Sequence, residues 1–234
     1  ADDTSFKFEP RAGYGIAVDI GTTTMAAQLL DLSTAGVLAT ETALNPQGTF
    51  GADVMSRLAA ATSAGSAIKM RESARSEVAG MVSRLCRHLP AGGIIARGAL
   101  VGNTAMHHLF LGFDVTPLGS YPFRAAHLEG VDLRGADIGW SGPAADAQTW
   151  FLPNLGGFVG SDILAVIIAT RLHEATSPCG GADLGTNGEL IISSNGTMLV
   201  ASTAAGPAFE GARISQGMRA APGAIDRMTV ENGS

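Results

Sequence analysis

Cysteine is almost absent from this sequence, and its scarcity excludes several kinds of protein. Among the 234 residues there are only two cysteines, Cys86 and Cys179, which lie far apart in the chain. A disulfide framework needs more cysteines at closer spacing. A metal cluster held by thiolates needs about four. We therefore expect neither in this chain.

Long apolar runs are also lacking. The longest strongly apolar stretch, Ile163 to Thr170, is far shorter than the roughly 20 residues that a membrane-spanning helix needs. The segment Ala1 to Arg11 is polar and acidic, without the apolar region of an export signal. The sequence therefore predicts a cytoplasmic protein with no membrane segment.

Charge is low and scattered. Charged residues make up 15% of the chain, the net charge is −6, and neither sign forms a long run. Clustered Lys and Arg, the usual mark of nucleic-acid binding, are missing. Hydrophobic residues make up 46% of the chain, which is enough to build a globular core. We expect a globular protein that does not bind nucleic acid.

Several common catalytic and nucleotide-binding motifs are missing. There is no G-x-x-x-x-G-K-[ST] loop, no G-x-G-x-x-G after a strand, no serine nucleophile elbow, no H-E-x-x-H and no C-x-x-C. Nucleotide binding through the two commonest glycine-rich motifs is therefore excluded.

Apolar periodicity predicts a chain that mixes strands and helices. The segment 112–149 is rich in proline and glycine and has no sustained period, so loops with short strands are expected there. Strands are expected at 14–20, 25–32, 37–44, 94–101, 150–155, 182–185, 189–193 and 197–202. Helices are expected at 52–61, 68–88, 104–111 and 162–174. The first three strands would form a meander that ends at the turn Asn45-Pro46-Gln47. The second helix has apolar residues at three-and-four spacing (Val78, Met81, Val82 and Leu85), and Gly102-Asn103-Thr104 would supply the N-cap of the third.

Two β regions share one pattern. Val18-Asp19-Ile20-Gly21-Thr22 and Ala182-Asp183-Leu184-Gly185-Thr186 each read as a buried strand that ends in Asp, an apolar residue, Gly and Thr. A hairpin is expected after each. A duplicated unit is the economical explanation.

The residue types in these turns suit phosphate binding. Glycine lets backbone N–H groups approach an anion, and the hydroxyls of Thr22–Thr24 add donors. Asp19 and Asp183 could hold Mg²⁺, which prefers oxygen ligands and keeps several waters. Two such turns that face each other would clamp one polyphosphate and its metal. The alternative is that each aspartate only caps its own turn.

Further strings along the chain carry a family resemblance. They are Asn45-Pro46-Gln47, Phe50-Gly51-Ala52-Asp53-Val54-Met55-Ser56-Arg57, Gly102-Asn103-Thr104-Ala105-Met106, Leu152-Pro153-Asn154-Leu155-Gly156-Gly157, Asp183-Leu184-Gly185-Thr186-Asn187-Gly188-Glu189 and Gly206-Pro207-Ala208-Phe209-Glu210-Gly211. In this order they resemble the ATPase domain of reductive activators of corrinoid-dependent enzymes. These activators belong to the actin-like superfamily, with acetate and sugar kinases, heat-shock chaperones and actin. The resemblance covers about Tyr14 to Asp226.

The resemblance implies an α/β, duplicated ribonuclease-H-like (actin-like) fold of two lobes, with mixed sheets flanked by helices. Residues 1–13 would be a linker from an upstream domain. Residues 14–150 would form the first lobe, with 112–149 as an inserted loop region. Residues 151–234 would begin the second lobe, which is expected to be incomplete because family members continue with a glycine-rich adenosine-binding segment.

The resemblance also implies a function. ATP and Mg²⁺ would bind, and ATP hydrolysis would be coupled to reduction of Co(II) to Co(I) on the corrinoid protein of a methyltransferase system. The electron would come from a reductant protein or a ferredoxin domain. A [2Fe–2S] cluster is expected only on a domain outside this chain, because two cysteines cannot ligate it. The oligomeric state, a homodimer included, stays open.

Two other functions fit the same residues. One is a small-molecule kinase of the same superfamily, which would need an acceptor pocket. The other is a non-catalytic module in which ATP switches the grip on a protein partner.

The candidate site residues follow from the turns and the resemblance. The candidate catalytic residues are Asp19, Asp183, Asp162 and Glu189, with Asp19 and Asp183 also the metal ligands. Asp162 would be a base or orient water, or only cap a helix. Glu189 would face metal-bound water, or be an exposed strand carboxylate. The expected nucleotide-binding residues are Gly21, Thr22, Thr23, Thr24, Gly102, Asn103, Asn154, Gly156, Gly157, Gly185, Thr186, Asn187, Gly188, Gly206, Pro207 and Glu210.

Other notable residues are better explained by structure than by chemistry. We expect Arg57 to form a surface ion pair with Asp53, four residues earlier on a helix. We expect His107 and His108 to pack within a helix. Asn195-Gly196 is explained by a type I′ hairpin turn rather than by glycosylation. Gly206-Pro207 and Glu210 fit a nucleotide loop or a plain proline-started helix.

Overall fold

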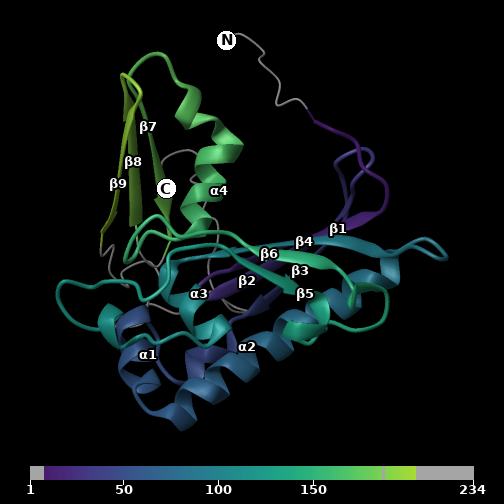
Figure 1. Ribbon diagram of the computed structural model, residues 1–234, viewed down its shortest axis with the longest axis horizontal. Helices are drawn as coiled ribbons and strands as arrows, with labels where there is room; N and C mark the ends of the chain where they lie inside the picture. Colours follow the sequence, from purple (N-terminus) through teal and green to yellow (C-terminus); the bar gives the residue numbers. More distant parts are fainter. Residues whose placement is uncertain (1–7, 186–187, 204–234) are drawn as a thin grey trace, which may run out of the picture. The chain divides into compact units, whose positions relative to one another are not determined.

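A computed structural model describes residues 8–185 and 188–203 of the chain (Figure 1). By their contacts the residues divide into two compact units, Ala1–Ala175 and Thr176–Ser234. The lobe boundary expected after residue 150 differs from this division, because the helix that follows packs on the first unit's sheet. Each unit is described below by itself.

The first unit is built on a mixed sheet of six strands in the order β3-β2-β1-β4-β6-β5. The first three strands form the expected antiparallel meander, β4 and β6 run parallel to β1, and β5 returns antiparallel at the edge. The strands are β1 (Tyr14–Ile20), β2 (Thr24–Asp31), β3 (Gly36–Leu44), β4 (Ile95–Gly102), β5 (Val131–Arg134) and β6 (Gln148–Phe151). β5 lies within 112–149, the segment expected to form loops with short strands.

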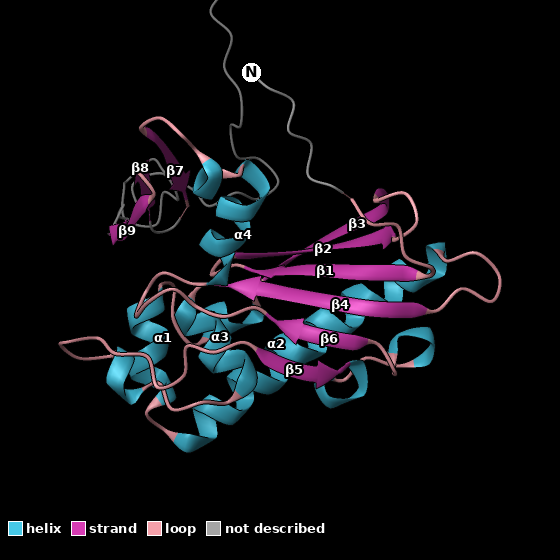
Figure 2. Cartoon of the chain, turned by 45° about the horizontal axis from the view of Figure 1, so that its top comes forward, coloured by secondary structure: helices cyan, strands magenta, loops and turns pink. Residues whose placement is uncertain are grey.

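Helices cover this sheet on both faces (Figure 2). On one face lie α1 (Val54–Ala61), α2 (Ala64–Leu85) and α3 (Thr104–Leu111), and on the other lies α4 (Ser161–Thr170). Short 3-10 helices connect these elements: η1 (Pro46–Thr49), η2 (Cys86–His88), η3 (Thr116–Leu118), η4 (Gly135–Ile138), η5 (Gly142–Ala144) and η6 (Leu172–Glu174).

The core of the first unit lies between the sheet and α2. Apolar side chains recur along α2 at three-and-four spacing, which puts them on one face of the helix. Those expected at Val78, Met81 and Leu85 are fully buried, as is Met70. They pack with the alternate apolar residues of β1, so the predicted helix stripe is confirmed.

Two elements end four residues earlier than expected. The helix expected to reach residue 174 stops at Thr170, because Arg171 takes a left-handed backbone conformation with φ 56°. The strand expected over 150–155 is β6, which ends at Phe151. Beyond it the chain leaves the sheet, and the backbone N–H of Asn154 donates to Leu128 O.

The expected surface pair between Arg57 and Asp53 is wrong. Arg57 is 1% exposed, and its Nε donates to Gly51 O at 2.9 Å. Asp53 is the N-cap of α1, where its carboxylate accepts from the backbone N–H of Ser56 at 2.8 Å. The four-residue spacing misled because Asp53 lies just before the helix rather than on its surface.

The adjacent histidines of α3 pack as expected. His107 and His108 are both fully buried, and the His107 ring meets Phe151 edge-on with centroids 4.6 Å apart. Burial, together with the neighbouring His108 and His127, lowers the pKa of His107 to about 3. Within the described residues no three His, Cys, Asp or Glu side chains gather as a metal site.

The second unit contains an antiparallel sheet in the order β7-β8-β9. Its strands are β7 (Cys179–Leu184), β8 (Gly188–Ser194) and β9 (Thr197–Thr203). Asn195 and Gly196 join β8 to β9 with φ of 51° and 73°, which confirms the expected hairpin turn with two positive φ values. The strand, turn and hairpin pattern of β1–β3 therefore recurs in β7–β9, as the duplicated sequence predicts.

Residues 8–185 and 188–203 include no helix with the length and apolar character needed to cross a bilayer.

Candidate functional site

Parallel pairing in the first unit brings strand ends together at one edge of the sheet. Ile20, the last residue of β1, lies beside Gly102, the last residue of β4. Both strands therefore end at the same edge of the sheet, where α/β folds commonly bind ligands. The turn Gly21–Thr24 leaves from β1, and Asn103 leaves from β4.

Asn103 joins these two segments. Its Nδ2 donates to Thr22 Oγ1 at 2.8 Å, and its Oδ1 accepts from the backbone N–H of Met106 at 2.9 Å. The second bond makes Asn103 the N-cap of α3, as expected. One side chain thus caps a helix and holds the threonine of the predicted phosphate turn.

A third segment, residues 154–162, reaches the same edge. Thr104 Oγ1 donates to Gly156 O at 2.7 Å, and the buried Ser161 hydroxyl lies 3.2 Å from both the backbone N and the O of Gly102. The structure therefore brings together three segments that carry predicted residues. These residues are Asp19, Gly21, Thr22, Thr23 and Thr24 on the first, Gly102 and Asn103 on the second, and Asn154, Gly156, Gly157 and Asp162 on the third.

Asp162 stands in the first turn of α4. Its Oδ1 accepts from the backbone N–H of Ile163 at 2.8 Å. The N-cap of α4 is Gly160, so Asp162 is not the cap that the sequence offered as the alternative to catalysis; its carboxylate instead bonds an N–H of the first turn. The start of a helix also favours negative charge, so α4 contributes an anion-favouring end to this edge.

Asn154 is the buried amide whose partners are missing among the described residues. It is 6% exposed, and neither Oδ1 nor Nδ2 has a hydrogen-bond partner there. Buried amides of this kind are normally satisfied by a ligand or by water. The donor and acceptor of Asn154 therefore fit a polar ligand.

Gly21 shapes the turn after β1. A Cβ added at this residue would collide with the backbone oxygen of Thr24. Only glycine lets the turn close in this form. Asp19 lies one residue before the end of β1 and is exposed, so a carboxylate stands beside the turn.

The second unit presents a carboxylate pair at the matching place. Asp183 lies one residue before the end of β7, and its cross-strand partner is Glu189 on β8. Ser202 of β9 donates to Glu189 Oε1 at 3.0 Å. Glu189 is 8% exposed, so it is not the exposed strand carboxylate that the sequence allowed as an alternative.

The environment of Glu189 changes its acidity. Burial raises its pKa above the ordinary value, the charge of Asp183 raises it further, and the hydrogen bond from Ser202 lowers it. A carboxyl group with a raised pKa can exchange a proton closer to neutral pH. The pair therefore suits acid–base work or the orientation of a water.

The remaining predicted residues divide into two groups. Gly185 lies in the turn after β7, and Gly188 begins β8. Thr186, Asn187, Gly206, Pro207 and Glu210 lie outside the described residues. The relation between the two predicted turns stays a prediction, because they lie in separate units.

One supporting residue was not predicted to have a role. Asn45 Nδ2 donates to Gly21 O at 2.8 Å. The only local signal for it is the Asn-Pro pair after β3, which the sequence explains equally well as a turn.

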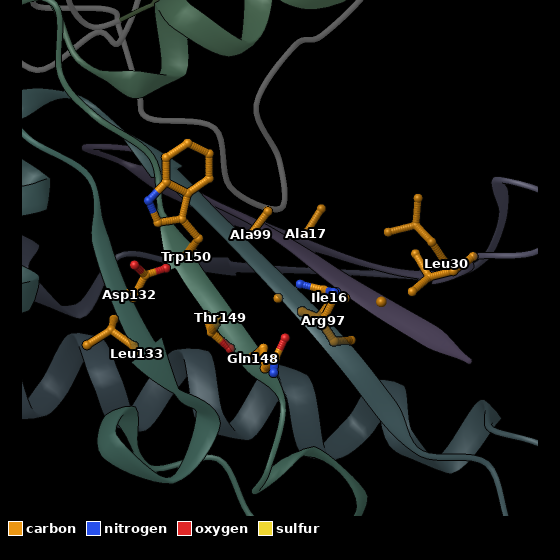
Figure 3. Close-up of a pocket in the computed structure, with 13 residues that line it drawn as sticks. Ile16, Ala17, Leu30, Arg97, Ala99, Asp132, Leu133, Gln148, Thr149 and Trp150 are labelled. Carbon is orange, nitrogen blue, oxygen red and sulfur yellow. The ribbon is translucent and has the colours of Figure 1, made fainter. Parts of the chain in front are cut away.

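A cavity of about 570 Å³ lies elsewhere on the first unit's sheet (Figure 3). Trp150 and its cross-strand partner Asp132 line one end of the cavity, and Leu30 lines the other. Ala17 and Ala99 lie between the two ends. No candidate catalytic or nucleotide-binding residue lines this cavity. We therefore place the candidate site at the strand ends, where the polar groups converge.

Comparison with known proteins identifies relatives for both units. Residues 14–175 match the family region described as the RACo middle region, and residues 181–234 match the C-terminal domain of RACo, the ASKHA domain. The corrinoid activation enzyme RamQ of Eubacterium limosum is 36% identical over 222 residues, which are 94% of this chain and 37% of that protein. The [Co(II) methylated amine-specific corrinoid protein] reductase of Methanosarcina barkeri is 29% identical over 221 residues, covering 91% and 40%.

A solved structure agrees with these sequence matches. A reductive activator for corrinoid, iron-sulfur protein superposes with a TM-score of 0.79 at 31% identity, covering 93% of this chain and 34% of that one. The expected actin-like fold class is confirmed. The chain spans between about a third and two fifths of the length of these relatives.

The glycine at the start of the turn can be tested by substitution. We expect Gly21→Ala to lower the free energy of unfolding by about 1–3 kcal/mol, because the new methyl group must displace the Thr24 carbonyl. Gly65→Ala on α2 is the matched control, since a Cβ there meets nothing within 4 Å and alanine favours the helix. Chemical denaturation measures both. Equal stability of Gly21→Ala and the parent would contradict the described turn.

The buried carboxylate can be tested through pH. Because the native pKa of Glu189 is raised, the native state holds this proton more tightly than the unfolded state. The parent should therefore lose stability relative to Glu189→Gln as the pH rises through the ordinary titration range of a glutamate carboxyl and above it. Denaturation of both proteins at each pH gives the difference. A difference that does not change with pH would show that Glu189 ionises as freely as in the unfolded chain.

Proposed function

Because this chain belongs to the RACo family of reductive activators, we propose that it binds and hydrolyses Mg-ATP to drive reduction of a corrinoid protein from Co(II) to Co(I). The observation that carries the proposal is the convergence of the Gly21–Thr24 turn and Asn103 at one edge of the sheet, where the segment 154–162 joins them through Thr104 and Ser161. Two relatives, a corrinoid activation enzyme and a Co(II) corrinoid protein reductase, support the same activity.

The proposal assigns a role to each group at this edge. Backbone N–H groups and hydroxyls of Gly21–Thr24 would bind phosphate oxygens. Asn154 would use its unpaired amide toward the same ligand. The N-termini of α3 and α4 would favour the negative charge.

The carboxylates would serve the metal and the water. Asp19 and Asp183 would hold Mg²⁺ directly or through water, which matches the preference of this ion for one or two carboxylates plus waters and phosphates. Bound Mg-ATP would supply the free energy released when water hydrolyses its terminal phosphoanhydride bond to give ADP and phosphate. Glu189, with its raised pKa, would accept a proton from the attacking water. Asp162 is the alternative base.

Reduction of Co(II) to Co(I) needs one electron, and this chain contains only two cysteines. We propose that a reductant protein or a ferredoxin-type domain supplies the electron. The role of the present residues would be to couple ATP hydrolysis to a change of the corrinoid partner, which makes that electron transfer favourable.

The proposed metal ligands can be tested by isosteric substitution. We expect Asp19→Asn and Asp183→Asn each to lower kcat for Mg-ATP hydrolysis about 100-fold, because a carboxylate near the metal is lost. Asp132→Asn, an exposed strand aspartate away from the site, is the matched control. Steady-state hydrolysis measures all three. Parent-like rates in both site variants would refute the assignment.

The partner can be tested in the same assay. Addition of a Co(II) corrinoid protein and a low-potential reductant should accelerate hydrolysis and produce the Co(I) absorption spectrum only when ATP is present. Acceleration by a small hydroxyl or carboxylate acceptor, with no effect of the corrinoid protein, would instead identify a kinase. Nucleotide-dependent partner binding without hydrolysis would identify a non-catalytic switch.

The unpaired amide gives a separate test. We expect Asn154→Leu to weaken Mg-ATP binding about tenfold while leaving stability unchanged or higher, because two unsatisfied buried polar atoms are removed. Thr149→Val is the control, since its buried hydroxyl bonds Ala147 O away from the site. Calorimetric titration and thermal unfolding measure the two effects. Loss of stability with unchanged affinity would mean that Asn154 is a structural residue.

A further inference from the structure

One buried asparagine donates hydrogen bonds to two carbonyl groups of the turn after β1. Asn45, which follows β3, is 5% exposed. Its Nδ2 donates to Gly21 O and its backbone N–H donates to Thr23 O, both at 2.8 Å. We propose that Asn45 is a positioning residue that orients the Gly21–Thr24 turn for phosphate, an inference that rests on the proposed function.

Peptide geometry gives these two bonds a consequence for ligand binding. In a trans peptide the carbonyl oxygen and the following N–H point in opposite directions. Because Asn45 holds the carbonyls of Gly21 and Thr23 on its own side, the N–H groups of Thr22 and Thr24 point to the other side. Backbone N–H groups arranged in this way are what an anion-binding turn requires.

Asn103 completes the arrangement from the α3 side. Its Nδ2 donates to Thr22 Oγ1, so that oxygen acts as an acceptor toward the protein. The hydroxyl proton of Thr22 is then left to donate to another oxygen. The backbone and the side chain of the turn are thus each oriented by a separate asparagine.

Both ends of the Asn45 amide are bonded within the protein. Its Oδ1 accepts from the backbone N–H of Gln47 at 3.0 Å, and its Nδ2 faces Met106 Sδ at 3.5 Å besides Gly21 O. The amide orientation follows from these partners, since the oxygen meets a donor and the nitrogen meets acceptors. Asn45 therefore acts through the turn and not by contact with the nucleotide.

Asn45→Ser separates the two functions of this side chain. Serine can still accept from Gln47 N–H as a cap, but it is too short to reach Gly21 O. The matched control is Gln47→Met, which removes a buried hydrogen bond to Met70 O in the same region without touching the turn. Thermal unfolding of both variants checks that they fold.

The experiment is calorimetric titration of the protein with Mg-ATP, together with the amide NMR spectrum. We expect Asn45→Ser to bind about tenfold more weakly and to shift the Thr22 and Thr24 amide signals, while Gln47→Met binds like the parent. Parent-like affinity in folded Asn45→Ser overturns the positioning role and leaves the proposed function intact. Absence of Mg-ATP binding by the parent overturns the proposed function and the inference with it.

A measurement on the parent covers the case in which Asn45→Ser does not fold. Added Mg-ATP should shift the backbone amides of Thr22 and Thr24, while the side-chain amide protons of Asn45 stay protected from exchange with and without nucleotide. Loss of that protection on binding, or unshifted turn amides in a protein that binds Mg-ATP, would overturn the positioning role.

Discussion

Parallel pairing of β1 with β4 is the constraint on which the first unit's site depends. The register places Ile20 beside Gly102, so both chains leave the sheet at the same level. A hydrogen bond from Asn103, the N-cap of α3, to Thr22 then joins α3 to the turn after β1. The segment before α4 joins them through Ser161 and Thr104. Segments that are far apart in sequence thus form one polar edge.

The amide side chains at this edge fall into two kinds. Asn45 and the half-buried Asn103 use their donors and acceptors within the protein, where they hold the turn and cap a helix. Asn154 is as buried as Asn45, yet its amide has no partner among residues 8–185 and 188–203. Since an unsatisfied buried amide costs free energy, a fold keeps one where a ligand or water completes it. The contrast separates the residues that build this edge from Asn154, the residue proposed to contact the ligand.

Local patterns along the sequence predicted much of the fold. The meander of β1–β3, the apolar stripe of α2, the Asn103 cap and the Asn195-Gly196 turn all depend on residues close in sequence. The prediction that Arg57 lies on the surface was wrong, because the burial of a side chain depends on what packs against the helix and not on residue spacing within it. The role of Asn45 was missed for a similar reason, since its partner Gly21 lies in the turn after β1, 24 residues away in the sequence.

The sequence by itself determined the repeated Asp-x-Gly-Thr corner, the residue types of the proposed phosphate site and the family to which they point, because these depend on which residues follow one another. Tertiary structure alone decided the pairing between strands. In the first copy Asp19 faces Ala26, whereas in the second, with a turn one residue shorter, Asp183 faces Glu189. The physical reason is that a strand has a two-residue period, so its register decides which side chains meet. The acidity of Glu189 and the partners of Asn45 both follow from such pairings.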